Sequence, residues 1–95
     1  MSRLFEHLRR LVREERYVIG QHASERLELR GIMEWQAVVG LEDGACLREN
    51  QDSQPNPTVE VREILPDGTE FKAVWAYMQR SDLAKLVTVH FFDVD

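Results

Sequence analysis

This chain of 95 residues has few cysteines and prolines, no long hydrophobic run and no excess of basic charge. Its single cysteine, Cys46, forbids an internal disulfide and excludes a cysteine-based zinc site. The first 15 residues carry four arginines and no uninterrupted apolar stretch, so they predict neither a signal peptide nor a membrane span. These absences predict a cytoplasmic protein without a membrane partner, and no metal or cofactor is expected.

The net charge of −5 is unevenly distributed along the chain. Residues 1–30 carry seven arginines and five glutamates, a charge of +2, whereas residues 31–95 carry five basic and twelve acidic residues, a charge of −7. Proteins that bind nucleic acid gain much of their affinity by neutralising phosphates. An acidic chain is therefore expected to bind DNA or RNA poorly. A nucleic-acid ligand therefore requires a local basic patch from the N-terminal third. Alternatively, that third docks on the acidic remainder or on an acidic partner.

Hydrophobic periodicity divides this single domain, residues 1–95, into a helical first half and a strand-rich second half. Helical spacing predicts three helices, at residues 2–15, 22–30 and 34–41. Alternating spacing predicts four strands, at residues 45–50, 58–65, 69–78 and 84–92. Ser2 is the expected N-cap of the first helix, Gly31 ends the second in the left-handed conformation, and Tyr17–Ile19 is a short β-prone stretch. The sequence thus predicts an α+β fold, with N-terminal helices packed on one face of a four-stranded antiparallel sheet.

Alternation also assigns side chains to the two faces of each predicted strand. In the last strand, Val87 and Val89 are expected on one face, and Leu86 and His90 on the other. Five aromatic side chains are expected in the core rather than as a base-stacking platform: Trp35, Phe71, Trp75, Phe91 and Phe92.

The predicted helix at 22–30 carries the most informative pattern, because His22, Arg26 and Arg30 recur four residues apart. On a helical wheel these three basic groups share a side with Leu29 and Leu27, while the glutamates mark the opposite, solvated side. The basic groups are therefore expected to point toward the body of the protein. Buried or half-buried cations need acceptors, which come from the protein's carboxylates or from a ligand.

The same helix belongs to a longer pattern that resembles a known family. The matching segments are Tyr17-Val18-Ile19-Gly20-Gln21-His22, Glu25-Arg26, Arg30-Gly31-Ile32, Val38, Asp43-Gly44 and Leu86-Val87-Thr88-Val89. With its His-x-x-x-Arg-x-x-x-Arg-Gly-Ile core, this pattern resembles a bacterial family of domains of unknown function that is similar to the RelE/ParE and BrnT toxins. The resemblance covers residues 17–92 and implies a toxin-like core to which residues 1–15 add an amphipathic helix. It also implies a toxin of a toxin–antitoxin pair, with an antitoxin as partner and RNA cleavage as one activity.

Metal-free RNA cleavage needs a base for the 2′-hydroxyl, cations that hold the phosphate, and an acid for the leaving oxygen. His90 suits the acid or base because imidazole titrates near neutrality, and His22 is a candidate to share that role. Arg26 and Arg30 are candidates to brace the phosphate with forked donors, and Lys72 to add a point charge. The three histidines of the chain lie on separate predicted elements and form only a weak zinc pattern.

The same residues also admit a structural interpretation, in which the chain is a non-catalytic domain that binds a protein partner. Arg26 then pairs with a carboxylate such as Glu42 or Asp43, and Arg30 bonds the last carbonyls of its helix. The other three candidates are then solvated or satisfied side chains. The apolar stripe of the helix at 2–15 packs on its own sheet or on a second copy, which gives a homodimer.

Overall fold

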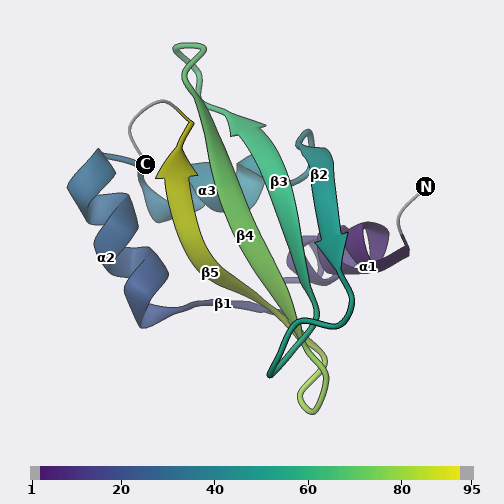
Figure 1. The fold of residues 1–95 in the computed structure, drawn as a ribbon. Helices are drawn as coiled ribbons and strands as arrows, with labels where there is room; N and C mark the ends of the chain where they lie inside the picture. Colours follow the sequence, from purple (N-terminus) through teal and green to yellow (C-terminus); the bar gives the residue numbers. More distant parts are fainter. Residues whose placement is uncertain (1–2, 93–95) are drawn as a thin grey trace.

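A computed structural model describes residues 3–92, which form three helices and a five-stranded sheet (Figure 1). The helices are α1 (Arg3–Arg13), α2 (Gln21–Arg30) and α3 (Glu34–Gly40). The strands are β1 (Tyr17–Ile19), β2 (Ala45–Asn50), β3 (Thr58–Ile64), β4 (Glu70–Met78) and β5 (Leu83–Phe91). Ser2, the expected N-cap of α1, lies outside the described residues. The predicted α+β class and the helix and strand positions are confirmed.

The sheet has the order β1-β5-β4-β3-β2, and its last four strands pair antiparallel as predicted. The expectation of a four-stranded antiparallel sheet is nevertheless wrong, because β1 adds a fifth strand parallel to β5, with Tyr17 opposite Ala84 and Ile19 opposite Leu86. Parallel neighbours need a long crossover. Two helices and three strands intervene between β1 and β5, so the chain has ample length to return in the same direction.

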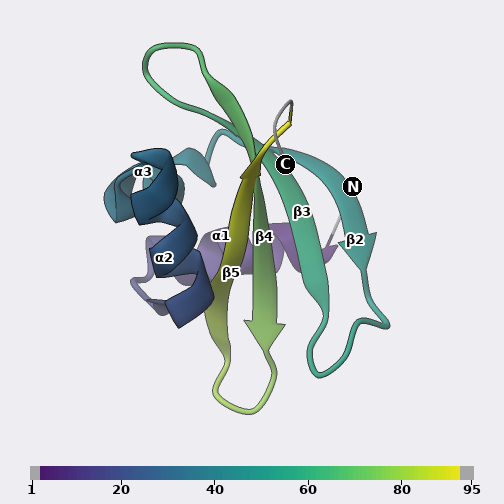
Figure 2. The same cartoon turned by 60° about the vertical axis from the view of Figure 1, so that its left-hand side comes forward.

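All three helices lie on one side of the sheet, with α2 alongside β5 (Figures 1 and 2). Among residues 3–92, no helix covers the opposite face, which we call the open face. The core lies between the two layers and includes Leu27 from α2 and Trp75 from β4. Within residues 3–92, no helix is long and apolar enough to cross a membrane.

The apolar stripe of α1 packs on the chain's own sheet. Phe5, Leu8 and Leu11 are all buried and belong to the same core cluster as the strand side chains. This is one of the two arrangements that the sequence allows for the stripe. A homodimer through residues 2–15 stays a prediction, which must use the polar side chains that α1 leaves outside.

A β-bulge decides which side chains of β5 face the helices. Trp75 pairs with Leu86 and Val74 pairs with Thr88, so β5 contains an extra residue between these two pairs. The bulge shifts the alternation by one position, and Leu86 and Val89 are both fully buried. The predicted grouping of Leu86 with the other face is therefore wrong, although His90 keeps its place opposite Val89.

The inward face of α2 is narrower than the helical wheel predicts. Ala23 and Leu27 are buried, and Arg26 and Arg30 are only half-buried. His22 is exposed, and so is Leu29, whose exposed fraction is 75%. The expectation that all the basic groups point inward is thus wrong for His22, because α2 packs on β5 through a stripe of one small and one large residue.

The end of α2 is as predicted. Gly31 has a φ of 68° and lies in the left-handed region that favours glycine. Its backbone N–H donates to the Glu28 carbonyl, and the Ile32 N–H donates to the Leu27 carbonyl. These two bonds satisfy carbonyls that the helix end otherwise leaves without donors. The chain is thereby turned from α2 into α3, which starts three residues later.

Candidate functional site

The predicted site residues meet around His90, at the margin of the open face next to α2. Lys72 on β4 lies directly opposite His90 in the antiparallel pairing. From α2, the Arg26 Nη2 atom lies 3.3 Å from His90 Nδ1. Arg30, one helical turn further on, lies with its guanidinium 5.7 Å from the centre of the Phe91 ring. The packing of α2 beside β5 therefore brings residues from two ends of the chain to one imidazole.

Burial lowers the pKa of His90, and the positive charges of Lys72, Arg26, Arg30 and His22 lower it further, with His22 contributing least. The imidazole is therefore neutral at pH 7. Because an arginine can only donate hydrogen bonds, Nδ1 is the accepting nitrogen and Nε2 carries the proton. The charges of Lys72, Arg26, Arg30 and His22 are thus all felt at the His90 imidazole, although His22 is exposed and Arg30 contacts the ring of Phe91.

Basic side chains continue from His90 across the open face. Arg62 on β3 lies opposite Lys72, and Lys72 lies opposite His90, so three neighbouring strands present a basic or imidazole group in one line. We call these three residues the basic row. Neighbouring strands lie about 4.8 Å apart, so the row spans roughly 10 Å. Carboxylates accompany it, since Lys72 Nζ lies 3.4 Å from Glu60 and Arg62 lies 3.8 Å from Glu70.

Arg62 is absent from the residues that the sequence singles out for the site. Its alternation with Val61 places it on the open face, but alternation alone does not say which residue of β4 lies beside it. The pairing register decides that, because a shift of one residue would place Phe71 or Ala73 opposite Arg62 instead of Lys72.

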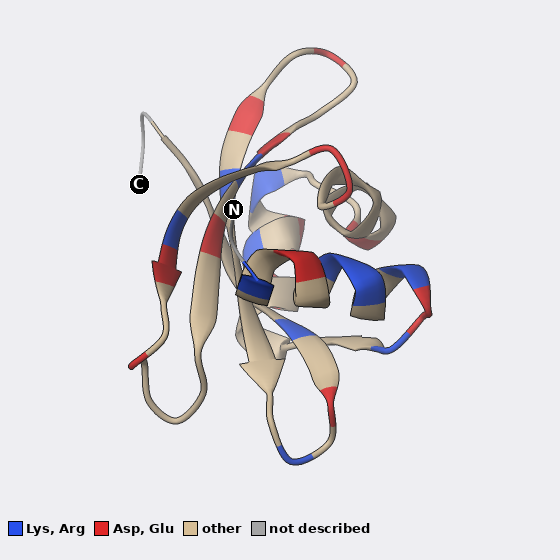
Figure 3. Cartoon of the chain, turned by 90° about the vertical axis from the view of Figure 1, so that its right-hand side faces the viewer, with Lys and Arg blue, Asp and Glu red and all other residues tan. Residues whose placement is uncertain are grey.

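The carboxylate of Glu42 has partners on α1. It lies 2.8 Å from the Arg9 guanidinium and also accepts hydrogen bonds from Arg13. The Arg13 hydrogen bond is the largest cause that lowers the pKa of Glu42 to about 2, and Arg9 adds to it. Figure 3 shows the basic segments of α1 close to the acidic turn that follows α3. The basic N-terminal third therefore docks in part on the acidic remainder. The predicted pairing of Glu42 with Arg26 is wrong, because Glu42 pairs with Arg9 and Arg13 of α1 instead.

Glu63 is a buried carboxyl group that the sequence analysis does not single out. It is fully buried on the helix side of β3, and Trp75 Nε1 donates to its Oε2 at 3.2 Å. Among the described residues, Oε1 has no hydrogen-bond partner. Burial raises the pKa of Glu63 to about 8, against the hydrogen bond from Trp75, which lowers it. The sequence did carry a signal for this burial. Glu63 follows Val59 and Val61 at a spacing of two, which places it on the same, otherwise apolar face of β3.

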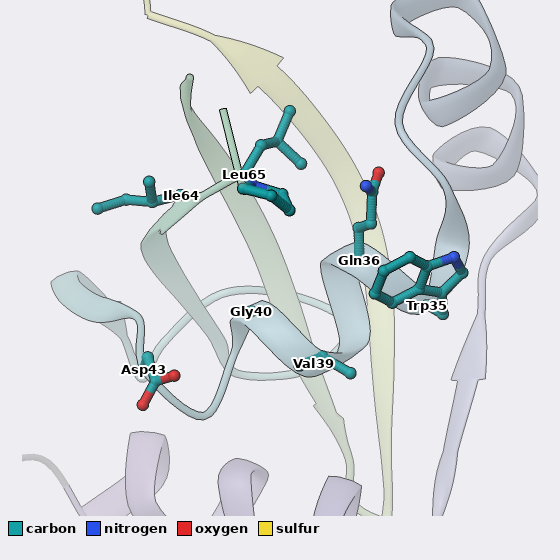
Figure 4. Close-up of a pocket in the computed structure, with 8 residues that line it drawn as sticks. Trp35, Gln36, Val39, Gly40, Asp43, Ile64 and Leu65 are labelled. Carbon is teal, nitrogen blue, oxygen red and sulfur yellow. The ribbon is translucent and has the colours of Figure 1, made fainter. Parts of the chain in front are cut away.

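A shallow groove runs between α3 and the end of β3 (Figure 4). It is lined by Trp35, Gln36, Val39, Gly40, Asp43, Ile64, Leu65 and Pro66. Trp35 was expected in the core with the other aromatic residues, but 57% of it is exposed. Phe92 is also exposed, whereas Phe71 and Trp75 are buried as predicted. We call this feature the α3 groove.

Comparison of the chain with protein-family models, curated proteins and solved structures finds no match.

Proposed function

We propose that the protein binds RNA at the basic row and cleaves it without a metal ion. The observation that carries the proposal is the convergence of Arg26, Lys72 and Arg62 with a neutral His90 on one sheet face. A phosphate backbone that follows the row meets a cation on β3 and on β4, and beside the neutral His90 of β5 it meets the Arg26 guanidinium from α2. The net charge of −5 acts only weakly at the row, because charges beyond a Debye length of about 8–10 Å are screened. Within that distance Glu60 and Glu70 each pair with one cation of the row, so an RNA phosphate replaces them as the partner of Lys72 and Arg62. We also propose that the protein is a cytoplasmic relative of the RelE/ParE- and BrnT-like toxins, as the sequence resemblance implies.

The proposed reaction uses His90 as general base. When the Arg26 guanidinium turns to a phosphate oxygen, His90 Nδ1 is released to take the proton of the 2′-hydroxyl. The 2′-oxygen then bonds to the adjacent phosphorus, and the bond from phosphorus to the 5′-oxygen of the next nucleotide breaks. Lys72 and Arg26 stabilise the charge that builds on the phosphate, and His22 protonates the leaving oxygen. The products are a 2′,3′-cyclic phosphate and a free 5′-hydroxyl.

Binding is tested with a fluorescein-labelled single-stranded RNA, whose anisotropy is measured at several salt concentrations. Lys72→Ala and Arg62→Ala are each expected to weaken binding and to reduce the slope of log affinity against log salt by about 0.7, the value for one lost phosphate contact. Arg80→Ala removes an exposed cation from the β4–β5 connection and is the control that leaves the slope unchanged. Equal slopes for all three variants and the wild type would rule out the basic row as a phosphate site.

Cleavage is tested on gels with the same RNA in the presence of a chelator, and with DNA of the same sequence. His90→Ala is expected to abolish RNA cleavage while most of the binding remains, and the DNA, which lacks the 2′-hydroxyl, is bound but not cut. Because the pKa of His90 is lowered by burial and by its cationic neighbours, the acidic limb of the wild-type rate profile should have its midpoint below the ordinary 6.5.

The structural interpretation of the same residues makes a different prediction. If Arg26 only holds α2 to β5, Arg26→Ala lowers the melting temperature, and the wild type neither binds nor cuts RNA. The proposal requires instead that Arg26→Ala loses cleavage while thermal unfolding still shows a cooperative transition.

A further inference from the structure

Several exposed apolar side chains lie together at the α3 groove, which is uncommon on a surface that faces only solvent. Trp35, Val39 and Ile64 are 57%, 61% and 56% exposed, and all three line the groove. They come from two elements that approach each other at Gly40, where a Cβ atom would lie 2.6 Å from Oε1 of the buried Glu63. Clustered exposed apolar residues of this kind mark sites of interaction rather than the scattered exposure of ordinary surfaces.

The size of the groove favours one side chain over a whole small molecule. Its volume is about 220 Å³, which is below the range of roughly 300–1,000 Å³ that encloses a small-molecule ligand. The groove is also open along its length, between Trp35 at one end and Asp43 at the other (Figure 4). An open groove of this size suits an anchor side chain carried by a protein segment that continues over both ends.

The charge around the groove is acidic. Asp43 lines it, and Glu34 and Asp67 are exposed directly beside the lining residues Trp35 and Pro66 in the sequence. Among the described residues that line the groove, none is basic. A two-fold contact with a second copy would bring these carboxylates toward their own equivalents, and an anionic membrane surface would be repelled. Complementarity therefore favours a partner segment that carries positive charge.

We infer that the α3 groove binds a segment of another protein that presents one large apolar side chain beside a lysine or arginine. The apolar side chain lies against Trp35 and Val39 on α3, and the cation pairs with Asp43. Neither His90 nor any of the other four candidate residues lines the groove, so this interaction is separate from the proposed RNA site.

The inference is tested by selecting random displayed peptides against the wild-type protein, after removal of peptides that bind Val39→Glu. The expected peptides share an aromatic or large aliphatic residue next to lysine or arginine. Synthetic versions, followed by fluorescence anisotropy, should bind Val39→Glu at least about tenfold more weakly than the wild type, as for a central interface residue. Leu47→Glu is the matched control, because Leu47 is 48% exposed on β2 and lies outside the groove.

Charge reversal provides a second readout. Asp43→Lys should change the selected peptides from basic to acidic, whereas Asp52→Lys, at an exposed position in the connection after β2, should leave the preference unchanged. The inference is overturned if no peptide prefers the wild type over Val39→Glu, or if Asp43→Lys leaves the preference basic. A homodimer in sedimentation that Val39→Glu disrupts would assign the groove to a second copy instead. RNA binding by Val39→Glu should equal that of the wild type, so failure here is distinguishable from failure at the basic row.

Discussion

At the scale of single residues, Glu63 links stability to pH. Its carboxyl group is fully buried, and burial raises its pKa to about 8 in the folded chain, compared with an ordinary value of 4.5. Between these two values the unfolded chain has released the proton and the folded chain still holds it. Stability therefore falls as pH rises from about 4.5 to about 8, by at most about 1.4 kcal/mol per pH unit from this group.

Glu63→Gln should remove this fall and make the protein more stable than the wild type near pH 8. The amide oxygen of glutamine still accepts the Trp75 hydrogen bond, and glutamine never ionises. Urea unfolding at about pH 5 and about pH 8 measures the difference. Glu60→Gln on the same strand is the control. Although partial burial raises the pKa of Glu60, its Asn50 hydrogen bond and Lys72 leave it below the ordinary value, so it does not titrate in this range. A wild type equally stable at both pH values would contradict the prediction.

The candidate site shows what residue types and spacing can predict. His22, Arg26 and Arg30 follow from the four-residue spacing of one helix, and Lys72 and His90 follow from the chemistry that a phosphate site needs. Neither pattern predicts that the other four candidates place their charges around the His90 imidazole, because that depends on the packing of α2 against β5. Arg62 and Glu63 were missed for a related reason. The place of Arg62 beside Lys72 depends on how β3 pairs with β4, and the burial of Glu63 depends on how the helices cover the sheet. Both are set by contacts between residues that are distant in sequence.

At the scale of elements, Glu42 joins α1 to the end of α3. The hydrogen bond from Arg13, with help from Arg9, lowers its pKa to about 2. A group whose folded pKa is lowered stabilises the fold above its ordinary pKa of 4.5 and loses that effect as pH falls toward about 2. The docking of α1 should therefore loosen in acid before the sheet is affected.

Glu42→Gln should lower the melting temperature at pH 7 and speed hydrogen exchange of the α1 amides. The difference from the wild type should shrink as pH falls below about 4 and as salt is added, since the contact is partly solvated. Glu14→Gln, at an exposed glutamate just after α1, is the control. Faster exchange throughout the sheet, rather than in α1, would show that Glu42 acts on the whole fold.

Element positions were predictable to within a few residues because each has a strong local pattern. The faces of those elements were predictable only where the pattern ran unbroken. In β4 the alternation holds for Phe71, Ala73 and Trp75, which are all buried. In β5 the bulge reverses it between Leu86 and Val89, and no local property of these apolar residues marks where the extra residue is inserted.

At the scale of the whole molecule, α1 contributes side chains to the core. Phe5, Leu8 and Leu11 are buried against the sheet, and burial of such side chains contributes about 1.5–3 kcal/mol each. Their sum, roughly 4.5–9 kcal/mol, is comparable to the total stability of about 5–15 kcal/mol that a domain of this kind has.

A chain that begins at Arg16 should therefore lack a cooperative thermal transition, as followed by circular dichroism. The full chain with Arg10→Ala and Glu14→Ala, two changes at exposed positions of the same segment, is the control that should still unfold cooperatively. A cooperative transition in the shortened chain would show that residues 17–92 form a self-sufficient core, as the family resemblance implies.

The sequence by itself determined the class of fold and the approximate bounds of its helices and strands, and it supplied the candidate residues for the proposed phosphate site. Hydrophobic periodicity and turn-forming residues act over a few neighbouring positions, so both can be recognised from the sequence alone. Only the tertiary structure decided that Tyr17–Ile19 joins the sheet, that Leu86 turns inward, that Glu42 serves α1, and that Trp35 remains outside the core. Each of these outcomes depends on contacts between residues far apart in sequence, where register and depth of packing outweigh local preference.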